Sequence, residues 1–239
     1  MINAVMNWSG GKDSSLSLWK VLSQKEVHVQ CLLTTINSAN DRISMHGVRS
    51  ALLEKQADAI GLPLQKILLP EMPTMSVYDE VMQNAMNILK QQNVTHSIFG
   101  DIFLEDLKAY RDSKLATVGL QGIYPLWQCN SKELMRMFID NGFKAVLVCV
   151  NEKYLDKSFC GRLIDDDLLE MLPENVDPCD ENGEYHSFVF DGPLFKKPID
   201  YNIGKMVYRN YAKPSTDDDN CHSNSSGYDT GFWYVDLLE

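Results

Sequence analysis

Apolar residues in the first half of the chain fall into two alternating patterns. Four short, nearly continuous runs have the length of strands: 4–8, 27–35, 64–69 and 95–99. Four longer segments repeat apolar residues every three or four positions, as helices do: 16–22, 48–60, 76–92 and 105–118. Strand and helix therefore alternate, which predicts an α/β fold with a parallel, doubly wound sheet. In such sheets ligands bind at the carboxyl ends of the strands.

The pattern changes after Pro125-Leu126-Trp127. A further helix and strand are expected at 131–142 and 145–150. Beyond them the sequence is acidic and rich in turns, with short apolar patches that predict strands at 188–190 and 232–235. The polar segment 213–230 has the composition of a surface loop or a partly disordered segment. We therefore predict an α/β domain followed by a smaller α+β part: residues 1–127 and 128–239.

Composition narrows the classes of function. The chain has 239 residues, 44% of them hydrophobic and 23% charged, which is ordinary for a globular protein. Its net charge of −11 disfavours a protein that grips a nucleic-acid backbone. No apolar run reaches the roughly 18 residues of a membrane span, and the first residues lack a signal-peptide pattern. Six cysteines without a C-x-x-C pair favour reduced, mostly buried thiols. We expect a cytoplasmic protein that binds neither nucleic acid nor membrane.

The segment Ser9-Gly10-Gly11-Lys12-Asp13-Ser14 lies between the first strand and the first helix and carries most of the chemistry. Two glycines allow a tight turn that brings bare N–H groups against a ligand, and the helix N-terminus adds positive potential. Lys12 supplies a cation, while the two serines supply hydroxyl groups. The segment is not a Walker A loop, which would need glycine in place of Met6. The alternative is a simple tight turn that begins a helix.

This segment resembles the pyrophosphate loop of the N-type ATP pyrophosphatases, which cleave ATP between the α and β phosphates. The resemblance implies ATP and Mg²⁺ as cofactors and Lys12 as the electrostatic clamp. Asp13 either holds Mg²⁺ or caps the helix. His46 meets phosphate or is a packing residue, and Thr34 and Thr35 contact adenine or are plain strand residues. The full set of cofactor-binding residues that we predict is Ser9, Gly10, Gly11, Lys12, Asp13, Ser14, Thr34, Thr35, His46, Gly100 and Asp101.

Residues 177–195 narrow the resemblance to the diphthine–ammonia ligase family, whose members carry a similar glutamate- and glycine-containing core. Further matches lie in the same order along the chain: Met45-His46-Gly47, Gly100-Asp101-Ile102, Arg111, Pro125-Leu126-Trp127 and Gly231-Phe232-Trp233. Asp180 stands where the family usually has glycine. His186-Ser187 stands where archaeal and eukaryotic members tend to have Glu-Thr, which resembles the bacterial branch. Diphthamide belongs to archaeal and eukaryotic elongation factor 2, so a bacterial member would need another substrate.

Residues 177–195 also supply the predicted substrate wall, by which we mean the side of the site that faces the ATP-binding loop and contacts the substrate. In it Glu184 is expected to be a general base and His186 a second proton-exchanging group. The alternative is a solvated acidic turn. Arg111 binds phosphate or a substrate carboxylate, or else forms an ion pair with Asp112 or Glu105. Cys221-His222 is read as structural or incidental. The predicted substrate-binding residues are Arg111, Glu181, Asn182, Gly183, Glu184, Tyr185 and His186.

The resemblance implies a ligase that adenylates a substrate carboxylate and transfers ammonia to it, releasing AMP and pyrophosphate. The expected partners are ATP, ammonia, and a small carboxylate or a modified histidine such as diphthine, which carries a quaternary ammonium and a carboxylate. A homodimer is kept open. One alternative is an ATP-binding enzyme of corrinoid metabolism, and another is a non-catalytic nucleotide sensor. A tRNA-modifying enzyme is disfavoured, because the chain has neither a basic excess nor paired cysteines.

Overall fold

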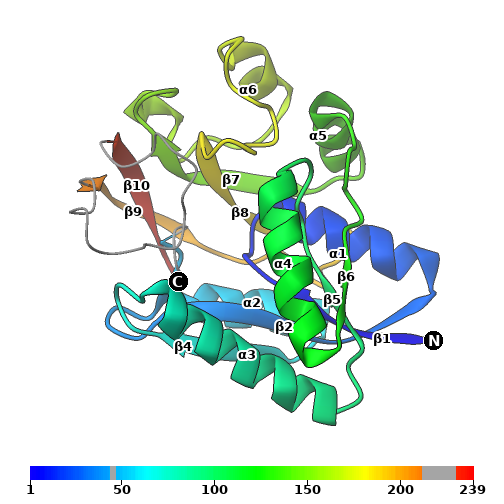
Figure 1. Cartoon of the computed structure of the whole chain (residues 1–239). Helices are drawn as coiled ribbons and strands as arrows, with labels where there is room; N and C mark the ends of the chain where they lie inside the picture. The colour runs from blue at the N-terminus through cyan, green and yellow to red at the C-terminus, as the bar shows by residue number, and fades with distance from the viewer. Residues whose placement is uncertain (44–46, 212–229) are drawn as a thin grey trace.

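Sheet A assembles from the apolar runs of the first half of the chain (Figure 1). The computed structural model describes residues 1–43, 47–211 and 230–239. The parallel strands of sheet A are β1 (Ile2–Asn7), β2 (Val27–Asn37), β4 (Leu64–Leu69), β5 (His96–Ile98) and β6 (Gln121–Ile123). They pair in the order β4-β2-β1-β5-β6, and the short β3 (Arg42–Ile43) runs antiparallel to the end of β2. The predicted parallel, doubly wound sheet is confirmed.

The strand order places a switch point beside β1. From β1 the chain moves outward through β2 and β4, and it then returns to the other side of β1 to form β5 and β6. The loops after β1 and β5 therefore leave neighbouring strands in opposite directions. A crevice at such a point is where open α/β sheets bind their ligands.

Helices cover both faces of sheet A because successive strand residues point to opposite sides. The helices are α1 (Lys12–Gln24), α2 (Ser50–Ile60), α3 (Met75–Gln91) and α4 (Glu105–Val118). Ala4 and Met6 of β1 belong to the core that α1 and α2 close, whereas Val5 belongs to the core that α3 and α4 close. In Figure 1 α3 and α4 lie on the side of the sheet that faces the viewer.

The second half of the chain builds an antiparallel sheet, sheet B, in the order β8-β7-β10-β9. Its strands are β7 (Lys144–Asn151), β8 (Tyr185–Asp191), β9 (Asn202–Tyr211) and β10 (Thr230–Leu238). Its helices are α5 (Ser131–Asp140), the short 3-10 helix η1 (Lys157–Phe159) and α6 (Asp166–Met171). An α+β architecture for this part was predicted, and it is confirmed.

The two sheets share one hydrophobic core. Buried residues of α5 and β7, such as Phe138 and Val148, belong to the same cluster as Leu16 of α1 and Leu52 of α2. A charged contact joins the two halves as well: Asp236 of β10 accepts hydrogen bonds from Arg42 and Arg49. The guanidinium of Arg49 binds it with two nitrogens, a geometry that fixes orientation as well as distance. The C-terminal strand is thereby held against the edge of sheet A.

Several elements differ from the sequence-based expectation. β3, β6 and β9 were not predicted, and the helix expected over 131–142 ends at Asp140. β9 could not be predicted from apolar residues, because nearly all of its described side chains are exposed. Without a buried face, the strand has no alternation of apolar and polar residues. The polar segment predicted over 213–230 lies outside the described residues, apart from Thr230, which begins β10.

The described residues bear on membrane spans and on the state of the cysteines. Among them, no helix combines the length and the apolar character that a membrane span requires. Five of the six cysteines lie in this part of the chain, and all five are free thiols. Cys31, Cys149, Cys160 and Cys179 are buried, while Cys129 is half-buried.

Candidate active site

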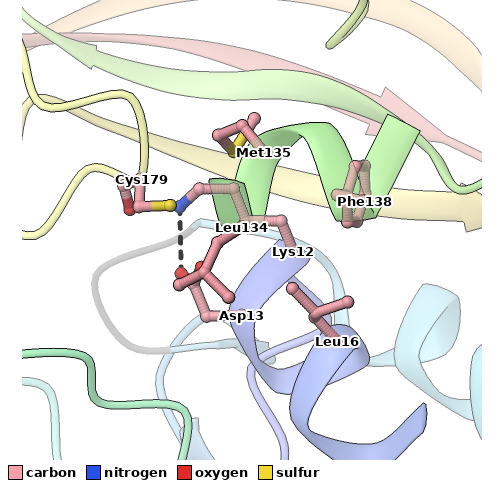
Figure 2. Close-up of a pocket in the computed structure, with 7 residues that line it drawn as sticks. All are labelled: Lys12, Asp13, Leu16, Leu134, Met135, Phe138 and Cys179. Carbon is pink, nitrogen blue, oxygen red and sulfur yellow. Dashed lines mark hydrogen bonds and ion pairs between the residues drawn. The ribbon is translucent and has the colours of Figure 1, made fainter. Parts of the chain in front are cut away.

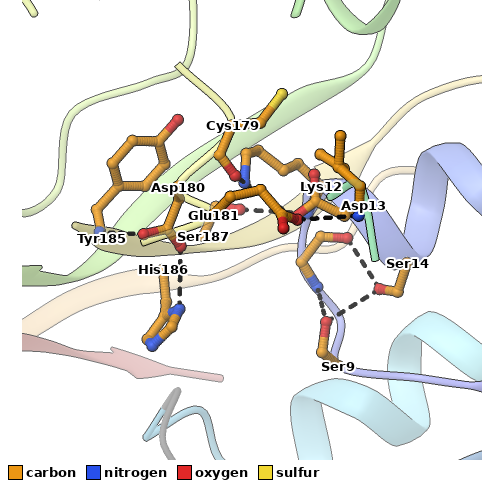
Figure 3. A network of polar contacts seen from close by, with 12 residues as sticks. Ser9, Lys12, Asp13, Ser14, Cys179, Asp180, Glu181, Tyr185, His186 and Ser187 are labelled. Atoms are coloured by element: carbon orange, nitrogen blue, oxygen red, sulfur yellow. Dashed lines mark hydrogen bonds and ion pairs between the residues drawn. The ribbon is translucent and has the colours of Figure 1, made fainter. Parts of the chain in front are cut away.

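The glycine loop predicted to bind phosphate connects β1 to α1 at the switch point. Gly10 adopts a φ of +75°, a left-handed conformation that glycine tolerates far better than other residues. A Cβ at this position would also lie 2.6 Å from Leu53. Gly11 is the N-cap of α1, and its N–H donates to Ser9 Oγ at 3.2 Å. Ser9 Oγ and Ser14 Oγ share a further hydrogen bond of 3.1 Å, so the loop is a preformed, tight turn (Figure 3).

Gly100, directly after β5, packs against the first turn of α1. A Cβ on Gly100 would lie 3.1 Å from the backbone carbon of Asp13 and 3.2 Å from the nitrogen of Ser14. Only a residue without a side chain allows this close approach. The structure thus brings Gly100 and the neighbouring Asp101 to the glycine loop, as the sequence predicted.

Lys12 is buried, with 3% of its side chain exposed, and its ammonium forms an ion pair with Asp13 at 2.9 Å. The same Nζ donates to the carbonyl of Cys179 and lies 5.2 Å from the centre of the Tyr185 ring. Burial lowers the pKa of Lys12, but the carboxylates of Asp13 and Asp180 and the groups of Tyr185 and Cys179 outweigh it and raise the pKa above its usual value. The ammonium is therefore a permanent positive charge at physiological pH.

Asp13 lies in the first turn of α1, but the cap is Gly11, and no side chain caps this helix. The predicted capping role for Asp13 is therefore wrong, because its carboxylate turns to Lys12 instead. Burial raises the pKa of Asp13, Lys12 opposes this, and the like charges of Asp180 and Asp101 add to the rise. In Figure 3 Lys12 and Asp13 face the segment that runs from Cys179 to Glu181. Negative groups therefore converge on one lysine.

β8 closes over the glycine loop from the C-terminal half. Ser187 Oγ accepts a hydrogen bond of 3.2 Å from the N–H of Lys12, and the N–H of Val189 donates to the carbonyl of Gly10 at 2.9 Å. A Cβ on Gly11 would lie 3.1 Å from the carbonyl oxygen of Ser187. The segment that was expected to face the glycine loop thus packs directly on it, through hydrogen bonds of Ser187 and Val189 that were not predicted.

Gln56 of α2 is a second residue that the sequence analysis missed. Its Nε2 donates to the carbonyls of Gly10 at 3.0 Å and Val189 at 2.6 Å, and its Oε1 accepts from Trp8 Nε1 at 2.9 Å. Gln56 is completely buried. The sequence did hold a signal for this role: Gln56 lies on the apolar side of its helix, where a buried polar side chain needs hydrogen-bond partners.

Glu184 lies inside the turn that precedes β8. The carboxylate is completely buried and accepts hydrogen bonds of 3.0 Å from the N–H groups of Asp177 and Asn182 and from the Asn182 side chain. These contacts fold residues 177–184 into a defined loop, which we call the β8 entry loop. The carboxylate predicted as a general base is thus engaged with the backbone of its own loop.

Glu181, at the tip of the β8 entry loop, reaches across to the loop after β5. Its two carboxylate oxygens accept from the N–H groups of Ile102 at 3.2 Å and Phe103 at 3.4 Å. Burial, together with the charge of Asp13, raises the pKa of Glu181 to about 7. A carboxyl group with this pKa exchanges protons near neutral pH.

The remaining residues of the predicted substrate wall have distinct positions. Asn182 is exposed, and Gly183 turns the chain with a φ of +77°. Tyr185 is buried, and its hydroxyl donates to the carbonyl of Pro178. His186 Nδ1 lies 3.2 Å from Oδ2 of Asp180, and the other oxygen of this carboxylate, Oδ1, accepts a hydrogen bond from the N–H of Tyr185. Asp180, the departure from the family pattern, therefore organises this part of the loop.

Arg111 of α4 forms its ion pair with Asp101, and not with Asp112 or Glu105 as the alternative prediction had it. Its guanidinium also lies 4.6 Å from the centre of the Phe99 ring. Burial raises the pKa of Asp101, and Arg111 opposes that rise. Arg111 and Asp101 were predicted as separate ligand contacts, and the structure joins them into one charged pair beside the glycine loop.

The predicted adenine-contacting residues lie at the carboxyl end of β2. Thr34 is buried, and its Oγ1 finds no hydrogen-bond partner among the described residues; Thr35 is half-buried. Unpaired buried hydroxyl groups are uncommon and costly. His46, the residue expected near phosphate, lies outside the described residues.

A small cavity lies beside Lys12, as Figure 2 shows. It is lined by Lys12, Asp13, Leu16, Leu134, Met135, Phe138 and Cys179, and its empty volume is about 150 Å³. The Lys12 ammonium donates a hydrogen bond to the carbonyl of Cys179. The β8 entry loop therefore covers the group that would contact a phosphate.

No three His, Cys, Asp or Glu side chains within the described part of the chain are grouped to hold a metal ion. Mg²⁺ is usually held by one or two carboxylates together with waters and substrate phosphates. Asp13 and Asp101 lie where the phosphate loop meets the loop after β5, which fits an ion of this kind that arrives with a nucleotide.

Comparison with known proteins covers both halves of the chain. The family model described as the diphthamide synthase N-terminal domain matches residues 1–122, and the one described as the C-terminal domain matches residues 130–212. Together they span most of the sequence. The predicted resemblance to the diphthine–ammonia ligase family is thereby confirmed.

Two mammalian relatives match most of the chain. A human protein named diphthine–ammonia ligase is 26% identical over 222 residues, covering 83% of this chain and 82% of its own, and a mouse protein of the same name is 27% identical over the same shares. Among solved structures, a predicted subunit of a tRNA methyltransferase from Methanocaldococcus jannaschii aligns with a TM-score of 0.42 at 19% identity. That alignment covers 83% of this chain and all of the other.

Proposed function

Because the chain belongs to the diphthamide synthase family, we propose that it is a ligase that uses ATP to join ammonia to a substrate carboxylate. The observation that carries the proposal is the glycine loop at the switch point, with a buried lysine whose ammonium pairs with Asp13 and whose pKa is raised. Relatives named as diphthine–ammonia ligases support a reaction that forms a C–N bond. Neither a nucleotide sensor nor an enzyme of corrinoid metabolism is favoured by any of these observations.

The first half of the proposed reaction uses the glycine loop. A substrate carboxylate oxygen attacks the α-phosphorus of ATP, and pyrophosphate leaves with the electron pair of the broken P–O bond. Lys12 and the N-terminus of α1 stabilise the charge that builds up on the leaving group. Mg²⁺ would neutralise part of the same charge. Asp13 and Asp101 are the residues proposed to hold it.

Thr34 supports an adenine position at the carboxyl end of β2. Its buried Oγ1 lacks a partner among the described residues, and a bound nucleotide would supply one. Thr35 and His46 stay predictions for the same side of the site.

In the second half, ammonia attacks the acyl carbon, the bond to AMP breaks, and one proton must leave the nitrogen. We assign this proton to Glu181, because its pKa is about 7 and it lies between the charged loops. Glu184 is reassigned to holding the β8 entry loop in shape, since its oxygens accept the N–H groups of that loop. His186 stays a second candidate for proton exchange.

The site must open before ATP can bind. The side chains around the cavity beside Lys12 leave no room for a nucleotide, and the Cys179 carbonyl accepts a hydrogen bond from Lys12. We propose that the β8 entry loop moves away from α1 as the nucleotide enters, and that Glu181 returns with it.

The acceptor is a carboxylate, either diphthine or a bacterial small molecule. His186-Ser187 continues to predict the bacterial branch of the family. A domain division near residue 128, a cytoplasmic location and a homodimer also stay predictions.

A product assay tests the proposed reaction. The protein is incubated with α- and γ-labelled ATP, Mg²⁺ and ammonium, with and without a panel of carboxylates. We expect AMP and pyrophosphate that depend on both carboxylate and ammonium. Formation of ADP and phosphate would refute cleavage at the α-phosphorus, and tight ATP binding without turnover across the panel would support the sensor.

The Glu181→Gln variant should lower turnover by about 100-fold and remove the dependence of the rate on a group that titrates near pH 7. In the wild type the rate should rise through about pH 7, because only the deprotonated carboxylate accepts a proton. The measurement is a pH profile of AMP release with the concentration of unprotonated ammonia held constant. Glu174→Gln, at an exposed position before the same loop, is the control and should keep the wild-type profile. An unchanged profile in Glu181→Gln would exclude the assigned role.

A further inference from the structure

Ser187 of β8 brings a hydroxyl group to the first turn of α1. Its Oγ accepts the hydrogen bond of 3.2 Å from the N–H of Lys12, and only 3% of the residue is exposed. A serine hydroxyl also has one proton to donate, and this proton has no acceptor among the described residues. Because a buried donor without an acceptor is unfavourable, the hydroxyl group suits a ligand that accepts a hydrogen bond.

The two serines of the glycine loop use their hydroxyl protons within the loop. Ser14 Oγ donates to the carbonyl of Gly11 at 3.0 Å, so Ser9 is the donor in the hydrogen bond of 3.1 Å that joins the two hydroxyl groups (Figure 3). Ser9 Oγ also accepts from the N–H of Gly11. These two hydroxyl groups therefore hold the loop in shape, whereas the proton of Ser187 is not used in this way.

The backbone of β8 fixes Ser187 against the glycine loop. Two residues further along the strand, the N–H of Val189 donates to the carbonyl of Gly10 at 2.9 Å. Gln56 Nε2 donates to the carbonyls of both Gly10 and Val189. Ser187 lies outside the β8 entry loop, residues 177–184, so the opening proposed above leaves it at the N-terminus of α1.

Carboxylate groups crowd the site in which a phosphate would lie. Asp13 forms an ion pair with the ammonium of Lys12. Burial and the charges of Asp13 and Asp101 raise the pKa of Glu181, which places these three carboxyl groups near one another. An oligophosphate brings further negative charge, so it needs hydrogen-bond donors as well as Lys12. A hydroxyl group that donates to an ionised phosphate forms a charge-assisted hydrogen bond, which is stronger than a neutral one.

We propose that Ser187 donates a hydrogen bond to the outer phosphates of the bound nucleotide. The proposal rests on the proposed function, which it deepens by adding a nucleotide ligand from the C-terminal half of the chain. The N–H of Lys12 occupies one lone pair of Ser187 Oγ and so directs the hydroxyl proton away from the helix. The phosphates are thereby held between α1 of one half and β8 of the other.

Binding of three ligands tests the proposal without turnover: inorganic pyrophosphate, α,β-methylene-ATP and AMP. Calorimetry is carried out on the full chain with Mg²⁺ at constant ionic strength. Ser187→Ala should bind pyrophosphate and α,β-methylene-ATP about ten- to hundredfold more weakly than the wild type. It should bind AMP as the wild type does, because AMP lacks the outer phosphates.

Further variants separate the hydroxyl proton from the fold. Ser187→Thr keeps the hydroxyl group and should bind all three ligands nearly as tightly as the wild type. Ser187→Cys has a similar shape but a weak donor, so it should show the loss expected for alanine and replaces that variant if alanine prevents folding. Ser17→Ala is the matched control, because Ser17 is a buried serine further along α1 whose hydroxyl donates to the carbonyl of Phe99. It should leave all three affinities unchanged.

Equal affinity of the wild type and of the alanine and cysteine variants for pyrophosphate would overturn the proposal. A loss that extends equally to AMP would also overturn it, because the hydroxyl would then support the shape of the loop and not contact the outer phosphates. These outcomes leave the proposed ligase intact, provided that the wild type binds α,β-methylene-ATP. A wild type that binds neither pyrophosphate nor the ATP analogue would contradict the proposed function itself.

Discussion

Replacement of Lys12 by methionine should lower carboxylate-dependent AMP formation by at least about 100-fold. A single group that stabilises charge in a transition state typically contributes a factor of roughly 10²–10³ to the rate. Lys12 is buried in the first turn of α1, directly after Gly10 and Gly11, and carries a positive charge. Methionine keeps the length of the stem, so the loss of rate reports the missing charge. Initial rates of AMP release at saturating ATP measure the effect.

Lys20→Met is the matched control for this variant. Lys20 lies on the same helix and donates to the carbonyl of Pro125, away from the glycine loop. It should retain the wild-type rate. Thermal unfolding of both variants separates loss of chemistry from loss of structure, because Asp13 loses its ion-pair partner in Lys12→Met. A stable Lys12→Met protein with full turnover would refute the role of the glycine loop.

Replacement of Gln56 by leucine should lower the free energy of unfolding by roughly 3–5 kcal/mol. Three buried hydrogen bonds are lost at once: Trp8 Nε1 loses its acceptor, the Val189 carbonyl loses a donor, and the Gly10 carbonyl keeps only the N–H of Val189. Each unsatisfied buried group costs about 1–3 kcal/mol. Since Gln56 also sets the position of Gly10, we expect a raised KM for ATP in the fraction that folds. Chemical denaturation and ATP titration give the two quantities.

Asp58→Ala provides the comparison on the same helix. Asp58 is exposed and lies on the opposite side of α2 from Gln56, so its replacement should change the free energy of unfolding by less than about 0.5 kcal/mol. If Gln56→Leu were as stable as Asp58→Ala, the three hydrogen bonds would contribute little to the structure. The glycine loop would then owe its shape to local contacts alone.

Two contacts of the β8 entry loop close the site over the glycine loop. Lys12 is held by Cys179 and Asp13, and Glu181 bridges to Ile102 and Phe103. Both contacts come from the β8 entry loop, which the buried Glu184 keeps folded. The opening proposed above would move this loop as a unit, and such closing segments commonly shield a reactive intermediate from water.

The amino-acid sequence by itself determined the parallel sheet, most helix positions and the glycine loop. These features are local: they depend on the period of apolar residues and on glycines that a turn requires. The alternation of strands and helices therefore suffices to assign Ser9 to Ser14 and Gly100-Asp101 to one edge of the sheet. The resemblance to the diphthine–ammonia ligase family likewise follows from motifs that stand in order along the chain.

Only the tertiary structure decided how the halves meet. Gln56, Ser187 and the Cys179 carbonyl reach the glycine loop from elements far apart in the sequence, and Arg111 selects Asp101 over its helical neighbours. The tertiary structure also gives different environments to two glutamates that are three residues apart. Glu184 is buried inside its own loop, whereas Glu181 lies at the site and has a raised pKa. Such roles depend on burial and on long-range charge, and neither is encoded in local spacing.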